Sequence, residues 1–288
     1  MKQKTIVVKY GGAAMQSEAL KRTVCEDAAA LAASGARLML VHGGGSELSA
    51  FMMQNGREPV FVDGLRYTDA ETVEAALMVL AGKINKELAA EIARAGGRAV
   101  GICGIDDGMI IARKQTEPDL GFVGEITKVD PYILEGLLSA GLIPVVASLA
   151  LGEDGQIYNV NADTAAGGIA AALRANAYIT LSDIPGVLRD TKDPATLIPA
   201  IRVSGENSEN SINNEINESG DSEYPAGAPT LEQLFADGVV SGGMIPKLNS
   251  LADAVRRGVG YAQIIDGRVP HALLDAVSGA AAGTRLIP

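Results

Sequence analysis

Two lysines, each beside a pair of glycines, are the residues of this chain whose type and spacing best suit chemistry. Lys9 lies at the end of an apolar, β-rich run, just before Gly11-Gly12. Lys247 follows Gly242-Gly243 at the start of a helical pattern. Glycines between a strand and a helix let an anion approach backbone N–H groups, and the helix dipole adds to the attraction. Taken singly, each lysine is more often a solvated surface residue, but together they indicate a site for one phosphate group.

Phosphoryl transfer is the reaction that such a pair can serve. Its transition state spreads charge over the transferred oxygens, so catalysis consists mostly of positioning and neutralisation. One ammonium about 4 Å from that charge gains on the order of 4 kcal/mol at an effective dielectric constant near 20. Asn159, Asn161 and Asp163 lie just before an Ala-rich helical pattern. Asp163 is therefore either a helix cap, the commoner role for an Asp at this place, or the acid that holds both lysines.

Arg66 and His42 are the other candidates. Arg66 directly precedes a predicted helix, and it is either a surface residue or a bidentate fork for a substrate carboxylate. His42 opens the run Gly43-Gly44-Gly45, where we expect a structural hydrogen bond rather than a catalytic base, because a carboxylate acceptor is already an anion. The chain lacks the GxxxxGK[ST] motif, which excludes a Walker-type NTPase. It also lacks the GxGxxG motif that is typical of a dinucleotide-binding fold.

Composition narrows the class of protein. With 288 residues and 47% hydrophobic content, the chain suits one large domain or two lobes that share a sheet. The net charge of −11 argues against nucleic acid and against an anionic membrane surface as partners. No run is apolar enough to span a membrane and the first residues do not resemble a signal peptide, so we expect a cytoplasmic protein. Cys25 and Cys103 lack CxxC spacing, so we expect no metal site formed by the protein itself.

Short apolar runs alternate with helical patterns, which predicts an α/β fold with a parallel sheet. We expect strands over residues 5–9, 37–41, 98–104, 142–149, 177–181, 261–265 and 284–287, with short antiparallel strands within 109–127. We expect helices over residues 17–34, 46–55, 68–95, 131–140, 230–236, 245–257 and 270–277, and an Ala-rich helix after Asp163. A capping box from Thr68 to Glu71 would open the longest of them. Residues 204–227 are acidic and poor in apolar side chains, which predicts a mobile insertion.

The order and spacing of several motifs resemble those of the amino-acid kinases, over nearly the whole chain. The motifs are Lys9-Tyr10-Gly11-Gly12, His42-Gly43-Gly44-Gly45, Gly64-Leu65-Arg66, Asn159-Val160-Asn161-Ala162-Asp163, Ser182-Asp183 with Gly186-Val187-Leu188, and Gly242-Gly243-Met244-Ile245-Pro246-Lys247. The resemblance implies a three-layer αβα sandwich around a mainly parallel sheet, with two lobes sharing that sheet. Residues 1–173 would bind the acyl amino acid and form a dimer contact, and residues 174–288 would bind the nucleotide.

Within that family, the chain is similar to the members that use ATP, with Mg²⁺, to phosphorylate the side-chain carboxylate of N-acetyl-L-glutamate in arginine biosynthesis. The resemblance implies that Lys9 and Lys247 stabilise the transferring phosphoryl group and that Asp163 organises them. It further implies substrate binding by Gly44, Gly45, Arg66, Asn159 and Asn161, and nucleotide binding by Gly11, Gly12, Ser182, Asp183 and Gly186. The chain lacks the terminal segments of arginine-inhibited hexameric members, so we expect a homodimer.

Two alternatives stay open on the sequence. The first is a kinase of the same family that acts on glutamate, aspartate or an aminoadipate-type acid. The second is a non-catalytic sensor of a nucleotide or an amino acid on the same fold. A sensor would be free to lose Lys9, Asp163 or Lys247, and their presence together argues against it.

Overall fold

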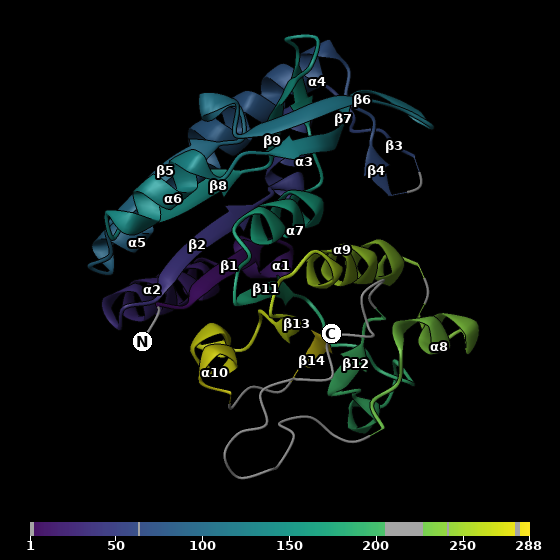
Figure 1. The fold of residues 1–288 in the computed structure, drawn as a ribbon. Helices are drawn as coiled ribbons and strands as arrows, with labels where there is room; N and C mark the ends of the chain where they lie inside the picture. Colours follow the sequence, from purple (N-terminus) through teal and green to yellow (C-terminus); the bar gives the residue numbers. More distant parts are fainter. Residues whose placement is uncertain (1–2, 63, 205–226, 241, 280–282) are drawn as a thin grey trace.

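An eight-stranded sheet, in the order β12-β14-β13-β11-β1-β2-β8-β5, runs through the centre of the molecule (Figure 1). The computed structural model describes residues 3–62, 64–204, 227–240, 242–279 and 283–288. The strands of this sheet are β1 (Thr5–Tyr10), β2 (Arg37–His42), β5 (Ala99–Cys103), β8 (Ile143–Ala147), β11 (Ala177–Ser182), β12 (Ala200–Arg202), β13 (Tyr261–Asp266) and β14 (Thr284–Ile287). Neighbouring strands are parallel except for β13 and β14, so the predicted mainly parallel sheet is confirmed.

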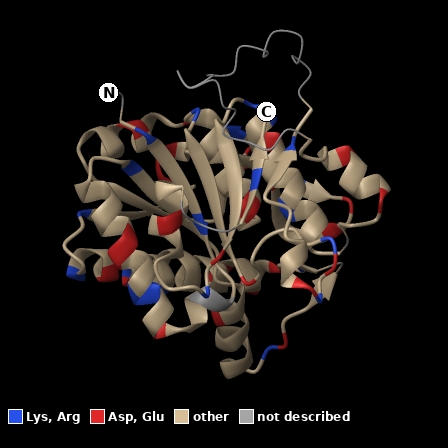
Figure 2. Ribbon diagram, turned by 90° about the horizontal axis from the view of Figure 1, so that it is seen from below, with Lys and Arg blue, Asp and Glu red and all other residues tan. Residues whose placement is uncertain are grey.

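Helices cover both faces of the sheet. Those on one face are α6 (Tyr132–Ser139), α7 (Ala162–Ala172), α8 (Leu231–Ala236) and α9 (Met244–Arg256), and those on the other are α2 (Glu18–Ala33), α3 (Gly45–Gln54) and α10 (Ala272–Ser278). In β1, Val7 joins the core of the first face while Ile6 and Val8 join the second, because successive strand side chains point to opposite sides. The result is the predicted αβα sandwich. Figure 2 shows charged residues mainly on the outer helices and loops, with few on the central strands.

The long helix predicted over residues 68–95 has the expected extent but differs in two details. It consists of α4 (Ala70–Ala76), a π-helical segment (Leu77–Ile84) and α5 (Asn85–Arg94), and the sequence pattern did not indicate the π segment. The predicted capping box is wrong, because the side chain of Asp69, not Thr68, accepts a hydrogen bond from the N–H of Thr72. Thr68 instead forms a parallel bridge with Gly121, so its backbone remains extended.

The single strand predicted over residues 142–149 is also wrong, because the chain changes sheets at Ser148. The N–H of Ser148 donates to the carbonyl of His42, whereas its own carbonyl accepts from the N–H of Val160. After it, β9 (Leu149–Gly152) joins β6 (Ile110–Thr116), β7 (Asp119–Val129) and β10 (Ile157–Asn159) in a separate, closed four-stranded sheet. β6 and β7 are antiparallel, as predicted, and β3 (Phe61–Val62) and β4 (Leu65–Arg66) form a small hairpin.

Strands from both halves of the chain share the large sheet, because β1 pairs with β2 on one side and with β11 on the other. The division into lobes at residue 173 stays a prediction. Most of the predicted mobile insertion, residues 205–226, lies outside the described residues. Among the residues that the structure describes, no helix is both long and apolar enough to cross a membrane.

Candidate functional site

The carboxyl ends of β1, β2 and β11 meet at one edge of the sheet. In the register of β1 with its two neighbours, Lys9 lies opposite Val41 of β2 and opposite Thr180 of β11. β1 lies between β2 and β11, so the strands of the two halves of the chain are added to the sheet on opposite sides of β1. In open α/β sheets, ligands bind at the carboxyl ends of strands beside such a reversal. Lys9 and Ser182 are therefore brought together at the edge where a ligand is expected.

Asp163 forms an ion pair with the first lysine. Its Oδ2 lies 3.0 Å from Lys9 Nζ, with side-chain exposed fractions of 18% and 11%. Asp163 is not the helix cap, because Asn161 Oδ1 accepts from the N–H groups of Asp163 and Thr164 at 2.9 and 3.1 Å. The second carboxylate oxygen, Asp163 Oδ1, is buried and has no hydrogen-bond partner among the described residues. The carboxylate is thus held against Lys9 and retains one open acceptor.

Lys247 approaches the same carboxylate from the start of α9. Its Nζ donates to Ser182 Oγ at 3.1 Å, and that hydroxyl lies 3.3 Å from Asp183 Oδ1. Burial lowers the pKa of Lys247, and the charge of Lys9 lowers it further, while Asp163 and Asp183 act in the opposite direction. Lys247 is therefore within electrostatic range of both members of the Lys9–Asp163 pair. The structure brings together both predicted lysines, the predicted acid and the predicted polar pair after β11.

Two hydroxyl groups that sequence reasoning missed hold the start of α7 in place. Ser250 Oγ, on α9, and Tyr178 Oη, on β11, donate to the backbone carbonyl of Asp163 at 2.9 and 3.0 Å. Ser250 lies three residues after Lys247, which puts the two on the same face of α9. The contact therefore sets the position of Lys247 relative to Asp163. In the sequence, the only signal for this role was the spacing of three residues between Lys247 and Ser250, which is typical of one face of a helix.

Arg66 is a buried cation that has no acidic partner among the described residues. It is 8% exposed, and its Nη2 donates to Gly45 O and Ser49 Oγ, both at 2.7 Å. Its guanidinium carbon lies 4.8 Å from the centre of the Phe61 ring. Burial lowers the pKa of Arg66, and none of the ion pairs among the described residues includes it. A buried guanidinium of this kind is suited to bind a carboxylate from outside the chain.

The remaining predicted site residues lie in turns or at the ends of helices and strands. Asn159 Nδ2 donates at 3.4 Å to the Oγ1 of Thr68, and Thr68 is close in sequence to Arg66. Gly44 has a φ of 153°, and a Cβ there would lie 2.2 Å from Ile84 Cδ1, so only glycine lets this turn approach the helix. Gly12 precedes α1 (Ala13–Gln16), and a Cβ on Gly11 would lie 3.3 Å from Lys9 Nζ. A Cβ on Gly186 would lie 2.6 Å from Thr284 Oγ1, so this glycine also permits close packing on β14.

His42 is a buried, neutral side chain, as expected for a structural role. Its Nδ1 lies 2.8 Å from Gly43 O, and its Nε2 lies 3.1 Å from Asn85 Nδ2. Burial lowers the pKa of His42 to about 4. Asn85, which sequence reasoning also missed, is a fully buried amide beside the apolar stripe of the long helix.

The low pKa of His42 predicts a loss of stability in acid. Between pH 6.5 and pH 4 the unfolded chain binds a proton that the folded chain does not, so the free energy of unfolding falls as the pH falls. From pH 7 to pH 5 the expected loss from this group is about 2 kcal/mol. Urea unfolding of the wild type and of His42→Asn at both pH values would measure this loss as the difference between the two proteins in how far the free energy of unfolding falls. Parallel pH profiles for the two proteins would contradict the assignment.

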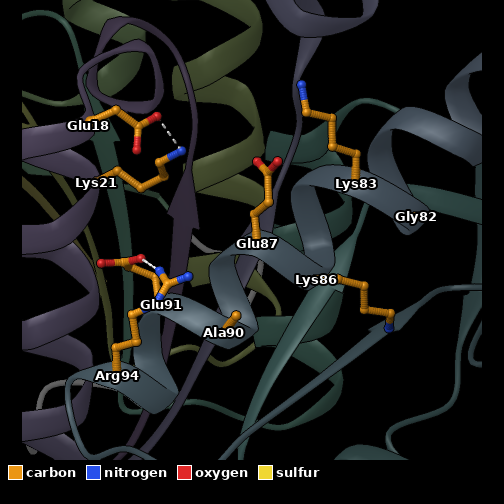
Figure 3. Close-up of a pocket in the computed structure, with 9 residues that line it drawn as sticks. All are labelled: Glu18, Lys21, Gly82, Lys83, Lys86, Glu87, Ala90, Glu91 and Arg94. Carbon is orange, nitrogen blue, oxygen red and sulfur yellow. Dashed lines mark hydrogen bonds and ion pairs between the residues drawn. The ribbon is translucent and has the colours of Figure 1, made fainter.

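A groove of about 550 Å³ lies elsewhere, between α2 and α5 (Figure 3). Its charged side chains are partly paired with one another, as in the ion pairs of Glu18 with Lys21 and of Glu91 with Arg94. None of its lining residues belongs to the strand ends that carry Lys9 and Ser182. The groove is therefore separate from the candidate site.

Comparisons with known proteins agree with this geometry. Residues 4–266 match the amino acid kinase family. Acetylglutamate kinase of Synechococcus sp. is 44% identical over 285 residues, which cover 99% of this chain and 86% of that enzyme. Acetylglutamate kinase of Clostridium kluyveri is 45% identical over 272 residues, which cover 94% of this chain and 87% of that enzyme.

Solved structures share the fold. N-acetylglutamate synthase of Neisseria gonorrhoeae, in complex with coenzyme A and N-acetyl-glutamate, superposes with a TM-score of 0.76 at 22% identity. That match covers 99% of this chain but 59% of the synthase, so the chain spans about three fifths of that protein. Carbamate kinase of Giardia lamblia bound to AMP-PNP superposes with a TM-score of 0.67 at 17% identity, over 99% of both chains. The chain therefore belongs to the amino acid kinase family.

Proposed function

We propose that the chain transfers the γ-phosphoryl group of ATP to the side-chain carboxylate of N-acetyl-L-glutamate, a step of arginine biosynthesis. The observation that carries the proposal is the cluster of Lys9, Asp163 and Lys247 at the carboxyl ends of the central strands. Relatives that cover nearly the whole chain at 44–45% identity bear the name acetylglutamate kinase. The buried Arg66 adds a second anion site, as an acceptor with two carboxylates requires.

In this proposal the two lysines act on the phosphoryl group from different elements. Lys9 comes from the end of β1 and Lys247 from the first turn of α9. Their ammonium groups neutralise the charge that spreads over the transferred oxygens, and this is most of what the protein can do for a loose transition state. Asp163 holds Lys9 through Oδ2, and its open Oδ1 is available to Lys247 when that side chain leaves Ser182.

The acceptor needs orientation rather than activation. Its side-chain carboxylate is ionised near neutral pH and attacks without a base. The guanidinium of Arg66 binds the α-carboxylate, and the N–H groups of Gly44 and Gly45 with the amides of Asn159 and Asn161 bind the rest of the molecule. Asn161 already uses its Oδ1 as a helix cap, so its Nδ2 is the group offered to the substrate. Gly11, Gly12, Ser182, Asp183 and Gly186 face the nucleotide in this proposal.

Mg²⁺ is proposed to accompany ATP. It prefers hard oxygen ligands and keeps much of its water, so one or two carboxylates beside the phosphates are enough to hold it. The exposed Asp183 supplies such a group at the strand ends. Bound there, Mg²⁺ would neutralise charge on the phosphate oxygens.

A homodimer is also proposed, with the long helix α4–α5 at the contact. Met78 on its π-helical segment is 51% exposed, and Met53 at the end of α3 is 58% exposed. Phe51, Glu74 and Met78 line a groove between these two helices. Exposed apolar side chains gathered in this way favour burial against a second surface.

The test of the activity is a coupled assay of ADP release over a panel of free and N-acetylated acids. N-acetyl-L-glutamate is expected to give the highest kcat/KM, because in this proposal Arg66 recognises the α-carboxylate and the N–H groups of the glycine turn bind the acylated part of the molecule. Glutamate, aspartate and aminoadipate test the sibling kinases. Higher kcat/KM with a free amino acid would replace the proposed substrate, and binding without turnover would favour a sensor.

A further inference from the structure

Asn85 is a buried amide in the interior of a long helix. It begins α5 directly after the π-helical segment and is 0% exposed. Asparagine is a poor helix former, and burying an amide costs free energy unless its polar atoms are hydrogen-bonded. An apolar residue of similar size would avoid both costs. The position of Asn85 therefore calls for a role beyond packing.

The contacts of Asn85 fix the orientation of its amide. Nδ2 lies 3.0 Å from Ile102 O on β5 and 2.8 Å from Val145 O on β8. Carbonyl oxygens only accept, so the NH₂ group must face the two strands. The same Nδ2 lies 3.1 Å from His42 Nε2, which must then accept as well. The two hydrogens of the amide serve three acceptors, so one hydrogen is shared.

This arrangement determines the tautomer of His42. Because Nε2 accepts, the proton of the neutral ring is on Nδ1, which donates to Gly43 O at 2.8 Å. The amide of Asn85 thus holds the ring, and the ring holds the first peptide group of the glycine turn. A histidine without Asn85 could exchange tautomers and release the carbonyl of Gly43.

Strand β5 makes room for the amide. A Cβ on Gly101 would lie 2.1 Å from Asn85 Oδ1, so a larger residue cannot occupy that position beside Asn85. Lys86 Nζ donates to Gly101 O at 2.5 Å and to Asn85 Oδ1 at 3.2 Å. Figure 3 shows Lys86 extending from α5 in a different direction from Lys83. All polar atoms of Asn85 therefore have partners.

The π-helical segment contacts the same turn. A Cβ on Gly44 would overlap Ile84 Cδ1 and lie 2.8 Å from Leu80 Cδ2, so the turn lies directly against this helix. The next residue, Gly45, presents its carbonyl to Arg66 Nη2 at 2.7 Å. The segment and Asn85 together thus hold the turn between His42 and Arg66.

We propose that Asn85 is a positioning residue for the acyl amino acid, acting through His42 to orient the peptide groups of Gly43, Gly44 and Gly45. The proposal rests on the proposed function only in taking this turn as part of the acceptor site. A small change in the direction of these N–H groups weakens acceptor binding without reaching the nucleotide.

The first test compares Asn85→Ala with Lys86→Met. Asn85→Ala is expected to raise the KM for N-acetyl-L-glutamate about tenfold while the KM for ATP changes by less than about twofold. Lys86→Met removes the contacts of that side chain with Gly101 O and with Asn85 Oδ1 but leaves the Nδ2 contacts of Asn85 with the strands and with His42. It should therefore leave both KM values within about twofold of the wild type. Loss of thermal stability in Asn85→Ala with an unchanged ratio of the two KM values would reduce Asn85 to a structural residue.

A second variant tests the link itself. His42→Asn can keep a donor near the position of Nδ1 but cannot reach Asn85, so it should also raise the KM for the acceptor. In that background, Asn85→Ala is expected to add less than about twofold. If the two substitutions raise the acceptor KM by independent factors that multiply in the double variant, the proposal is overturned. If Asn85→Ala does not fold, an unchanged acceptor KM in His42→Asn overturns it instead.

The activity of the wild type keeps the two proposals apart. If the substrate panel identifies another acid as acceptor, the proposed function fails, and the same KM ratios are measured with that acid. The KM ratios measured with that acid then decide the role of Asn85.

Discussion

Replacement of Lys247 by alanine is expected to lower kcat by roughly 10²–10³-fold, as the loss of one transition-state donor does. The ammonium is half-buried at the strand ends, within electrostatic range of Lys9 and Asp163, where its interaction with developing charge is stronger than in water. The KM values for both substrates should change much less, because the ammonium acts mainly on charge that appears during transfer. Steady-state kinetics with saturating Mg²⁺ and ATP would measure the effect.

Arg257→Ala is the matched control for this experiment. Arg257 follows the last residue of α9, pairs with Asp253 on the surface and carries the same charge as Lys247. Its replacement should leave kcat within about twofold, because exposed ion pairs contribute little. An unaltered kcat in Lys247→Ala would remove this lysine from the mechanism. An equal loss in both variants would show that net charge, not position, is responsible.

Arg66→Lys is expected to raise the KM for N-acetyl-L-glutamate roughly 10–100-fold, with little change in the KM for ATP. The guanidinium can donate to a carboxylate and to Gly45 O and Ser49 Oγ at once, whereas an ammonium is a compact point charge. Loss of a charge-assisted hydrogen bond costs about 1.5–3 kcal/mol, which sets the expected range. Kinetics with each substrate varied in turn would separate the two KM values.

Arg113→Lys provides the control for that substitution. Arg113 lies on β6, pairs with Glu125 at the surface and is distant in sequence from the candidate site. Its exchange should leave both KM values unchanged within about twofold. A selective rise in the KM for ATP in Arg66→Lys would place Arg66 in the nucleotide half of the site instead.

The layers of the fold were predictable because hydrophobic periodicity determines which faces are buried. The apolar run of β1 and the spaced stripe of α2 each match the structure to within a residue or two at either end. The break at Ser148 was not predictable, because both halves of the run are equally apolar and the change of sheet depends on distant hydrogen bonds. The π-helical segment was missed for a related reason, since its side chains continue the stripe of an ordinary helix.

The candidate site was predictable where a charged residue stood beside a motif. Lys9, Asp163 and Lys247 have that signature, and the structure places them near one another. The supporting residues have no such signature. Ser250 and Tyr178 act through a backbone carbonyl, and Asn85 acts through a histidine 43 positions away in sequence. Contacts of this kind exist only once the chain has folded.

The most direct test of the central claim is a crystal structure with N-acetyl-L-glutamate and a non-hydrolysable ATP analogue bound together. We expect Lys9 Nζ and Lys247 Nζ both to lie within about 3.2 Å of oxygens on or beside the γ-phosphate. Asp163 should still hold Lys9, and Lys247 should have moved from Ser182 toward the phosphate. A complex in which the γ-phosphate contacts neither ammonium, or in which the two nitrogens lie on opposite sides of α7, would contradict the mechanism.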